Sequence, residues 1–560
     1  MTDHWRRQAD PPTGFDSRLG LSELHARLLY NRGIRQPQEV EPFLSADRRS
    51  AHDPMLLPDM DVAVDRLRAA IDTGETVAVF GDVDTDGVTG TALLANALGE
   101  LGATVVTYLP DRVEEGHGLN EAAIRRLREQ AVSLIITVDC GVGSEDEIIL
   151  GASLGMDTVV TDHHAMIAGP SSAVATINPR RPDSEYPYPD LTGAGMAFKL
   201  AEALYSAAGR QRPEHLMELA ALGTVADVGP LTGENRHIVK RGLERLNATR
   251  SPGILALMGR TSLKPGSVDT GSLSFKIIPR LNSAGRLGDA RTSLDLLTAK
   301  STEVAEPLAA RLERDNDERR RLTEQGMIEA RAQVEAKRTA GGLPTALIVA
   351  SQDWIPGILG LIAGRLAETY GRPTAAVSLG HEVSRGSARS VPGFDIVGAI
   401  GHARDLLVRY GGHPQAAGFT VPTSSLFDLE RRLLAASEDH DPGPSRPEAV
   451  FEAEVSPSQL SGQTFEFIQS LAPFGEANPD PVFLSRNVRV LERRQVGRKA
   501  DHLKMRLSDG GKTWDAIAFR QGDKAGGVTR EIDLVYTIGL DDWGDRPRLQ
   551  LQVLDLRPTP

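Results

Sequence analysis

The stretch best suited to chemistry is GDVDTDG, residues 81–87, in which three carboxylates occupy alternate positions. Carboxylates as close as Asp82, Asp84 and Asp86 repel one another unless a cation neutralises them. Mg²⁺ and Mn²⁺ are hard cations that prefer such oxygen ligands. Taken alone, the same residues are equally well explained as an acidic turn whose aspartate caps a helix. The elements around the stretch must decide between the two interpretations.

Short apolar segments alternate with helical segments on both sides of this turn. We expect strands at 76–80, 104–109, 133–138, 157–161 and 173–177. Apolar strands separated by helices predict an α/β domain with a parallel sheet covered on both faces. Ligands of such sheets bind beyond the carboxyl ends of the strands.

Metal-ligand residue types recur at these strand ends. Asp82 follows the first strand, Asp139 the third, and Asp162-His163-His164 the fourth, while Asp227 follows an apolar segment further on. Each residue alone has a simpler explanation as a helix cap or a surface side chain. Together they predict an acidic site with one or two histidines, suited to two divalent cations.

The rest of the chain divides into further parts. We expect a helical segment at 1–60, a catalytic domain at 61–300, a connecting helix at 301–340, a second, smaller α/β domain at 341–435, a linker at 436–449 and a β-barrel at 450–560. The barrel is predicted from six short β runs within about 110 residues, the spacing typical of OB-type barrels.

Composition narrows the class of protein. The chain has 560 residues, a net charge of −13 and a single cysteine, Cys140, so an internal disulfide is excluded. The sequence has no apolar run near the roughly 20 residues that span a bilayer, and its first residues lack the apolar core of a signal peptide. We therefore expect a cytoplasmic protein without membrane contact.

The acidic total argues against broad, non-specific nucleic-acid binding. Between Arg486 and Arg506, however, the sequence has eight basic residues and only two acidic ones. Trp514, Phe519 and Trp543 lie near this basic stretch and are candidates to stack on bases. Burial of Trp514 and Phe519 in the barrel core is the alternative.

The motifs GDVDTDG, VDCG, TDHH and GTVADVGPL, in this order, resemble those of the DHH phosphoesterase superfamily. The segments INPRRPD (177–183), LTGENR (231–236) and PRLNSAGRLGDA (279–290) are similar to the RecJ family of single-strand-specific 5′→3′ DNA exonucleases. The resemblance runs over nearly the whole chain. It implies a metal-dependent exonuclease that hydrolyses phosphodiester bonds of single-stranded DNA in repair and recombination, with a DHH-associated domain and an OB domain.

The resemblance also implies roles for individual residues. The metal ligands, for two Mn²⁺ or Mg²⁺ ions, are Asp82, Asp84, Asp86, Asp139, His163 and Asp227, with Asp82 the least certain in role. The catalytic residues are His164, Asp139 and Arg280. The substrate-binding residues are Arg112, His164, Arg280, Asn282, Ser387, Arg389, Gly411, Gly412 and His413.

Three positions depart from the family pattern. Ile355 stands where RecJ proteins usually have histidine, and Val83 and His117 stand where they commonly have tyrosine. The implied partner is single-stranded DNA, with a single-strand-binding protein and a RecQ-type helicase as candidate further partners. The alternatives are a DHH phosphodiesterase acting on short RNA or dinucleotides, a non-catalytic replication scaffold, and a plain single-strand-binding protein.

Overall fold

The structure is a computed structural model that describes residues 5–112, 115–166, 171–440, 449–497, 499–541 and 548–559. The chain forms two compact units. The first unit contains residues 1–52, 228–241 and 447–560, and the second contains residues 53–227 and 242–446. Within the described residues, no helix combines the length and the apolar character needed to cross a membrane.

The second unit begins with a five-stranded parallel sheet. Its strands are β2 (Thr76–Gly81), β3 (Thr104–Tyr108), β4 (Val132–Val138), β5 (Asp157–Thr161) and β6 (Ala175–Ile177). Their order in the sheet is β3-β2-β4-β5-β6, and every neighbouring pair is parallel. The predicted parallel sheet is thus confirmed. The order reverses between β2 and β4, which is where such sheets bind ligands.

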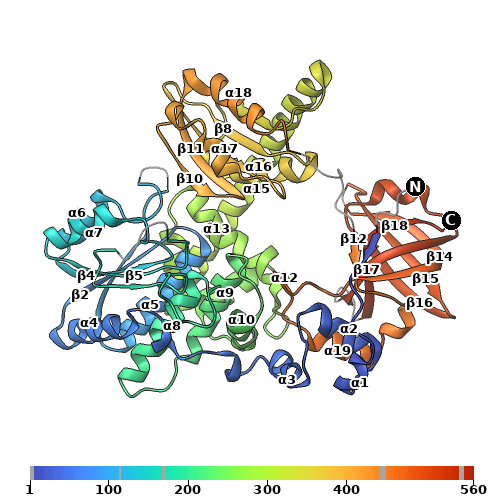
Figure 1. The fold of residues 1–560 in the computed structure, drawn as a ribbon, viewed down its shortest axis with the longest axis horizontal. Coiled ribbons are helices and arrows are strands. Elements are labelled where there is room, and N and C mark those ends of the chain that lie inside the picture. The colour runs from blue at the N-terminus through green and yellow to red at the C-terminus, as the bar shows by residue number, and fades with distance from the viewer. Residues whose placement is uncertain are drawn as a thin grey trace. The chain divides into compact units, whose positions relative to one another are not determined.

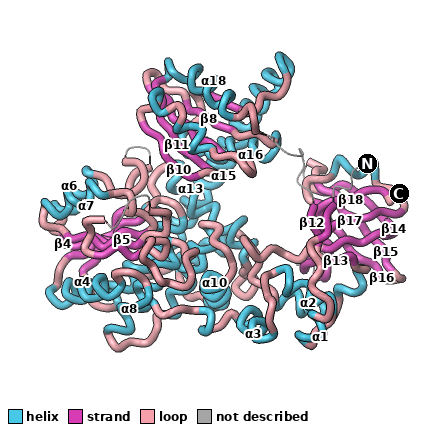
Figure 2. The backbone as a smooth tube through the Cα atoms, viewed as in Figure 1, coloured by secondary structure: helices cyan, strands magenta, loops and turns pink. Residues whose placement is uncertain are grey.

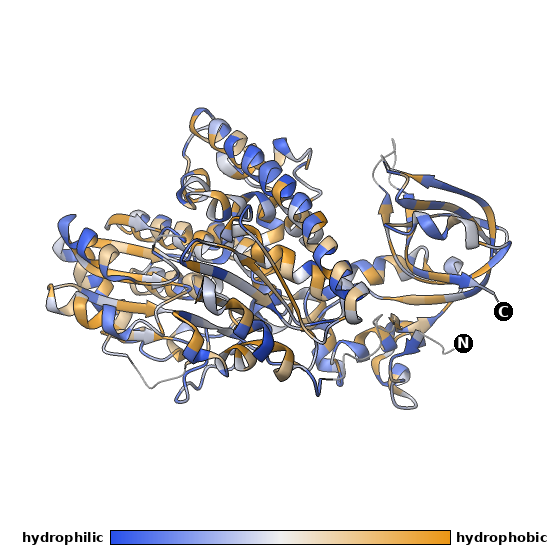
Figure 3. Cartoon of the chain, turned by 90° about the horizontal axis from the view of Figure 1, so that it is seen from above, coloured by the Kyte–Doolittle hydropathy of each residue, from blue (hydrophilic) through white to orange (hydrophobic). Residues whose placement is uncertain are grey.

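Helices cover both faces of this sheet (Figure 1). They are α4 (Met60–Thr73), α5 (Thr85–Glu100), α6 (Glu121–Glu129), α7 (Glu145–Ser153) and α8 (Gly193–Ala207). Ile124 and Leu127 of α6 and Ile148 of α7 pack against Phe80 and Ile135 of the sheet. Helices α5 and α8 pack together on the opposite face. The strands of this domain are largely hydrophobic (Figure 3) and, except for parts of β3, buried.

A group of helices follows the sheet along the chain. They are α9 (Met217–Ala226), α10 (Gly233–Leu246), α11 (Pro252–Arg260), α12 (Thr270–Ser272), the π-helix η4 (Leu273–Ile277), α13 (Ile278–Leu287) and α14 (Arg291–Leu297). Residues 233–241 of the second of them, α10, belong to the first unit. The apolar segment before Asp227 is the helix α9, and Asp227 is its C-cap. The long helix α15 (Thr302–Gly341) then leads out of this domain.

A second sheet follows α15. Its strands are β7 (Leu347–Ser351), β8 (Thr374–Ser378), β9 (Val383–Arg389), β10 (Arg409–His413) and β11 (Ala416–Pro422), in the order β10-β11-β9-β8-β7. Helices α17 (Ile396–Gly401) and α18 (Leu426–Ala436) cover one face. Helix α16 (Pro356–Tyr370) packs between α15 and the other face. On that side, residues of the outer strands β10 and β11 line a cleft.

The first unit is built on a closed barrel (Figure 2). Its strands are β13 (Ala453–Glu454), β14 (Phe483–Val496), β15 (His502–Asp509), β16 (Lys512–Ala518), β17 (Glu531–Asp541) and β18 (Arg548–Pro558), and pairing of β14 with β17 closes it. The predicted barrel is thus confirmed. Leu28 and Leu29 of α2 (Glu23–Asn31) join the core of the barrel, and β1 (Trp5–Arg7) pairs with β12 (Ala449–Phe451). The N-terminal residues therefore belong with the barrel.

Candidate active site

Strands β2, β4 and β5 end at the same level of the sheet. Gly81 of β2 is paired with Val138 of β4, and Val138 with Thr161 of β5. The amide of Asp82 donates to the carbonyl oxygen of Val138 at 3.2 Å, and the amide of Asp139 donates to that of Thr161 at 3.1 Å. Register alone therefore brings Asp82, Asp139 and Asp162 to one edge of the sheet.

Backbone amides hold two further carboxylates of the turn. Asp84 is the N-cap of α5, and its Oδ1 accepts hydrogen bonds from the amides of Asp86 and Gly87 at 3.0 and 3.1 Å. Asp86 accepts from the amides of Gly193 and Ala194, at the N-terminus of α8, at 2.6 and 2.9 Å. A helix N-terminus favours negative charge, so these amides orient both carboxylates and offset part of the cost of burying them.

Asp139 takes a backbone conformation that most residues avoid. Its φ is +62°, in the left-handed region, and its side chain is 5% exposed. A Cβ at position 193 would lie 2.4 Å from the Cβ of Asp139, so only glycine fits there. Strained residues of this kind cluster at functional sites. The strain here places Asp139 Oδ1 3.0 Å from Nε2 of His163.

Possible metal-binding groups overlap at this edge. In each of three sets the ligand atoms lie within 4.8 Å of one another: Asp139 with His163 and His164, Asp86 with His163 and Asp227, and Asp82 with Asp84 and Asp139. Because Asp139 and His163 each belong to two sets, the geometry suits two neighbouring cations better than one. All six metal ligands expected from the sequence are brought together.

Electrostatics support the same assignment. Burial, together with repulsion from neighbouring carboxylates, raises the pKa of Asp86 and of Asp139 well above the usual range, and that of Asp227 to about 6. Among the described residues, no lysine or arginine forms an ion pair with Asp86 or Asp139. Burial and the adjacent His164 lower the pKa of His163 to about 3. Crowded carboxylates beside a neutral imidazole fit a divalent cation.

Asp162 positions the second histidine. Its Oδ1 accepts from the amides of His163 and His164 and lies 2.7 Å from Nδ1 of His164. The hydrogen bond to Asp162 raises the pKa of His164 to about 9, so the ring is an imidazolium at neutral pH. The sequence placed Asp162 at the end of the fourth strand, in the TDHH motif, but predicted no role for it.

The open face of the second sheet forms the other wall of a cleft of about 790 Å³. His413, Ala416 and Arg389 lie side by side across β10, β11 and β9, and Gly411, Gly418 and Ser387 form the next row. The ring of His413 stacks at 5.8 Å on that of His164. The cleft is lined by the expected residues Asp82, Arg112, Asp139, His164, Ser387, Arg389, Gly411, Gly412 and His413.

Three of the arginines that line the cleft lie close enough to affect one another's pKa. Arg112 and Arg286 come from the first domain, and Arg389 comes from β9. Burial and the charges of Arg112 and Arg319 lower the pKa of Arg286 to about 10, and burial with Arg112 also lowers that of Arg389. Cations held together against their repulsion fit a doubly charged phosphate.

Arg286 and Arg280 lie on different faces of helix α13. Asn282 lies at the metal turn, because its Oδ1 accepts from the amide of Thr85 at 2.9 Å. Arg286 follows four residues later on the same helix face. Arg280 lies on another face, where its Nη2 donates to Glu313 of α15 at 2.8 Å, and it is not among the residues that line the cleft. Arg280 was predicted from the sequence as a substrate-binding residue, whereas Arg286 was not.

The three departures from the family pattern lie in different surroundings. Val83 is buried, at 2% exposure. Ile355 packs against the core between α15 and α16. His117 lines the cleft, with Nδ1 3.3 Å from Oδ1 of Asp82. Only His117 is therefore placed to meet a ligand.

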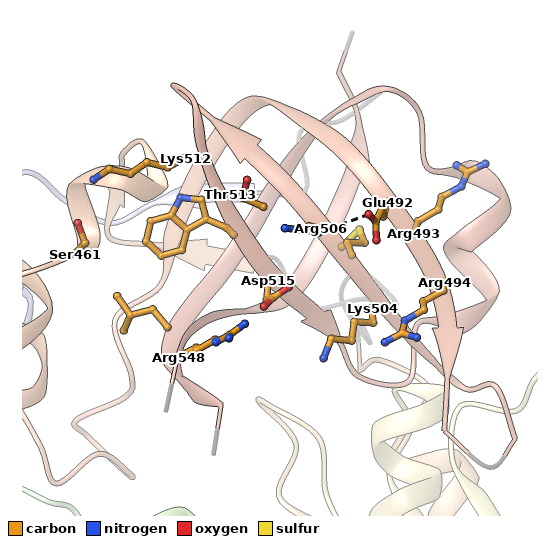
Figure 4. Close-up of a pocket in the computed structure, with 13 residues that line it drawn as sticks. Ser461, Glu492, Arg493, Arg494, Lys504, Arg506, Lys512, Thr513, Asp515 and Arg548 are labelled. Carbon is orange, nitrogen blue, oxygen red and sulfur yellow. Dashed lines mark ion pairs between the residues drawn. The ribbon is translucent and has the colours of Figure 1, made fainter. Parts of the chain in front are cut away.

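The barrel carries a separate basic groove of about 1080 Å³ (Figure 4). Its cations are Arg493, Arg494, Lys504, Arg506, Lys512 and Arg548. Trp514 is 6% exposed and belongs to the barrel core, whereas Phe519 is 56% exposed. Trp543 and Arg498 lie outside the described residues. Of the aromatic candidates that the structure describes, Phe519 is the more exposed, whereas Trp514 lines the groove with little exposed surface.

Carboxylates and a histidine at the switch point of a parallel sheet, facing an arginine-lined sheet, define a phosphoesterase of the DHH class. Family models agree: residues 76–224 match "DHH family, N-terminal domain", residues 344–437 match "DHHA1 domain", and residues 451–555 match "RecJ OB domain".

Individual relatives narrow the class. The chain is 33% identical to the single-stranded-DNA-specific exonuclease RecJ of Bacillus subtilis (strain 168), over 98% of this chain and 70% of that protein. It is 32% identical to RecJ of Escherichia coli (strain K12), over 99% and 98%. The crystal structure of RecJ with Mn²⁺ from Thermus thermophilus is similar with a TM-score of 0.85 and 31% identity, covering 100% of this chain and 80% of that one. The chain belongs to the RecJ family.

Proposed function

We propose that this protein is an exonuclease that hydrolyses single-stranded DNA from its 5′ end, using Mn²⁺ or Mg²⁺. One observation carries the proposal: Asp82 and Asp139, two of the clustered metal ligands, line the same cleft as Arg112, Arg286 and Arg389. A terminal phosphate bound by the arginines places the next phosphodiester near the carboxylates. A site that recognises the end of a strand and cuts beside it acts as an exonuclease.

In this proposal Asp84, Asp86, Asp139, His163 and Asp227 hold two cations. Bound divalent cations lower the pKa of water and neutralise charge on the phosphate. The residues of the chain fix the geometry: backbone amides orient Asp84 and Asp86, and Asp139 and His163 are shared between the ligand sets. Asp82 belongs to one ligand set and also lies 3.3 Å from His117, so we assign it to a supporting position.

His164 acts on the leaving group. Its Nδ1 is engaged by Asp162, which leaves Nε2 for the cleft. As an imidazolium it can donate a proton to the 3′ oxygen of the first nucleotide as the bond from that oxygen to phosphorus breaks. Water supplies the new oxygen on phosphorus, so the shortened strand again carries a 5′ phosphate.

The terminal phosphate is assigned to Arg112, Arg286, Ser387 and Arg389. The guanidinium of Arg389 donates to Oγ of Ser387 at 3.1 Å, which holds both groups at the floor of the cleft. Gly411 has open space where a Cβ would stand, so the substrate backbone can approach the sheet there. Arg280 is assigned a structural role through Glu313.

The test compares labels at the two ends. Single-stranded DNA labelled at the 5′ end should release labelled mononucleotide at once in Mn²⁺, whereas a 3′ label should shorten stepwise. Blunt duplex should resist, and EDTA should stop the reaction until Mn²⁺ is restored. Release of mononucleotide from the 3′ end, or faster cleavage of dinucleotides than of long strands, would contradict the proposal.

We also propose roles in DNA repair and recombination in the cytoplasm, with a single-strand-binding protein and a RecQ-type helicase as partners. The bacterial relatives and the single-strand substrate support this placement, since duplex DNA must be opened before such an enzyme can act. Co-purification of the full chain with each partner, with and without single-stranded DNA, tests it. If the chain does not bind one of these partners, that partner is excluded from the proposal.

A further inference from the structure

Arg319 is a half-buried guanidinium on α15 that forms no ion pair with any described carboxylate. Its Nη2 donates instead to the neutral Oδ1 of Asn316 at 2.8 Å, and its buried Nε has no acceptor among the described residues. Other arginines of the same helix do pair, as Arg321 does with Glu318. Burying a charge is costly unless it is paired. The unpaired charge of Arg319 therefore calls for an explanation.

Three helices meet around Arg319. Helix α13 packs on α15, where Oγ of Ser283 donates to the carbonyl oxygen of Leu312 at 3.3 Å. Arg319 follows Leu312 by seven residues, which is about two helical turns, so both lie on this face of α15. Helix α16 packs on α15 as well. It also touches α13 directly, because a Cβ at Gly357 would lie 1.9 Å from the carbonyl oxygen of Arg286.

Arg319 lies close enough to Arg286 to act on its charge. Arg286 lines the cleft, and its Nη1 donates to the carbonyl oxygen of Gly357 at 3.3 Å. Burial and neighbouring cations, Arg319 among them, lower the pKa of Arg286 to about 10. Burial and the charge of Arg365 on α16 lower the pKa of Arg319 in turn. Positive charge therefore continues from the cleft into the helices behind it.

The cleft around Arg286 is assigned above to the 5′ phosphate, and the inference rests on that proposed function. A phosphate monoester carries a charge of about −1.5 to −2 near pH 7. A partly buried charge is weakly screened and acts on such a group over several ångströms. A carboxylate beside Arg319 would cancel this effect, whereas the neutral amide of Asn316 leaves it intact.

We propose that Arg319 is a positioning residue for the terminal phosphate, whose unneutralised charge acts through Arg286. Repulsion from Arg319 opposes withdrawal of the Arg286 guanidinium from the cleft and keeps the phosphate pocket positive. Arg319 is not among the residues that line the cleft, so it does not touch the strand. Its effect therefore depends on the charge of the 5′ end and not on the bases.

The experiment compares two strands of one sequence, one with a 5′ phosphate and one with a 5′ hydroxyl, bound to the full-length protein in EDTA. Arg319→Gln should reduce the preference for the phosphate about 5-fold or more, by raising the Kd of the phosphorylated strand alone. In Mn²⁺ the loss should appear in KM and leave kcat nearly unchanged. Arg319→Lys keeps the charge and should retain most of the preference.

Asn316→Asp separates the charge of Arg319 from its packing. The substitution keeps the size of the side chain and places a carboxylate where the amide now accepts from Arg319. The guanidinium then stays in place with its charge neutralised, and the preference for the phosphate should fall as it does in Arg319→Gln. Arg331→Gln is the matched control, because Arg331 is exposed on α15, 12 residues further along.

An unchanged preference in Arg319→Gln or in Asn316→Asp would overturn the inference. So would an equal loss in Arg331→Gln, or equal weakening of both strands in Arg319→Gln. If wild type itself binds the two strands equally, the assignment of the cleft to a 5′ phosphate fails first. If wild type prefers the phosphate and the variants keep that preference, only the inference fails, so the two failures are distinguishable.

Discussion

The acidic edge of the parallel sheet and the basic groove of the barrel are built in contrasting ways. Asp86 is 1% exposed and Asp139 5%, and both are held by backbone or by a fixed histidine. In the groove, Arg506 is 53% exposed and Lys504 33%, and their carboxylate neighbours lie 3.7 and 3.9 Å away. The first region is rigid and its charges repel one another; the second is open and its charges are solvated.

The contrast shows two routes to nucleic-acid chemistry. Repulsion between crowded, buried carboxylates raises the free energy of the metal-free site. A bound cation relieves this repulsion, which strengthens its binding. Exposed cations gain affinity mainly by releasing counterions from the phosphates, which is sensitive to salt and tolerant of sequence. Substitutions should therefore have large, specific effects at the sheet edge and small, additive effects in the groove.

The largest effect is expected at Asp139. Asp139→Asn removes the carboxylate shared by two ligand sets, so the cleavage rate should fall by at least about 10²–10³-fold, as for other loss of preorganised charge at a reacting group. Single-turnover cleavage of 5′-labelled single strand in Mn²⁺ measures it. Binding of the same strand in EDTA serves as the control and should change little. A variant within a few-fold of wild-type rate would exclude the two-cation site.

The second effect concerns the pH profile. Asp162 is the main cause of the raised pKa of His164, about 9, so His164 is protonated below this pH and loses its proton above it. Asp162→Asn should move the alkaline limb of the rate toward neutral pH and slow cleavage at pH 8 about 10²-fold. His164→Gln should abolish that limb. An unchanged alkaline limb in Asp162→Asn would show that another group sets it.

The acidic site at the sheet edge could be predicted from the sequence, because it depends only on where each strand ends. Three of the five strands, β2, β4 and β5, are followed directly by an aspartate, and parallel register brings these strand ends together. Arg286 was not predicted because the resemblance to the family pointed to Arg280 in PRLN, although only Arg286 lies one helical turn beyond Asn282. Helical phase could have separated the two arginines.

The association of the N-terminal residues with the barrel has no such local signal. Leu28 and Leu29 pack with Phe483 and Leu534, more than 450 residues away in sequence. Apolar helices pack against many kinds of core, and a hydrophobic stripe does not specify its partner. The exposure of Phe519 and the burial of Trp514 depend in the same way on how the barrel closes.

A smaller effect is expected in the groove. Arg494 and Lys512 are exposed, and among the described residues they form no ion pair. The double variant Arg494→Ala with Lys512→Ala should weaken single-strand binding several-fold and reduce the salt slope by about 0.7 for each phosphate that is no longer neutralised. Arg338→Ala with Arg431→Ala, on α15 and α18, removes equal charge as the control. Equal weakening in both variants would indicate a general charge effect.

The smallest effect is on stability, and it tests the repulsion at the sheet edge directly. Asp86, Asp139 and Asp227 have raised pKa values in the folded protein, so protonation favours the folded state. Their contribution is complete below the ordinary aspartate pKa and is lost as pH rises, for Asp227 through about pH 6. In EDTA the Tm should therefore fall by a few degrees between about pH 4 and pH 7, and Mn²⁺ should reverse the fall. Asp139→Asn should flatten it. A Tm that falls equally with Mn²⁺ present would place the pH dependence outside the metal site.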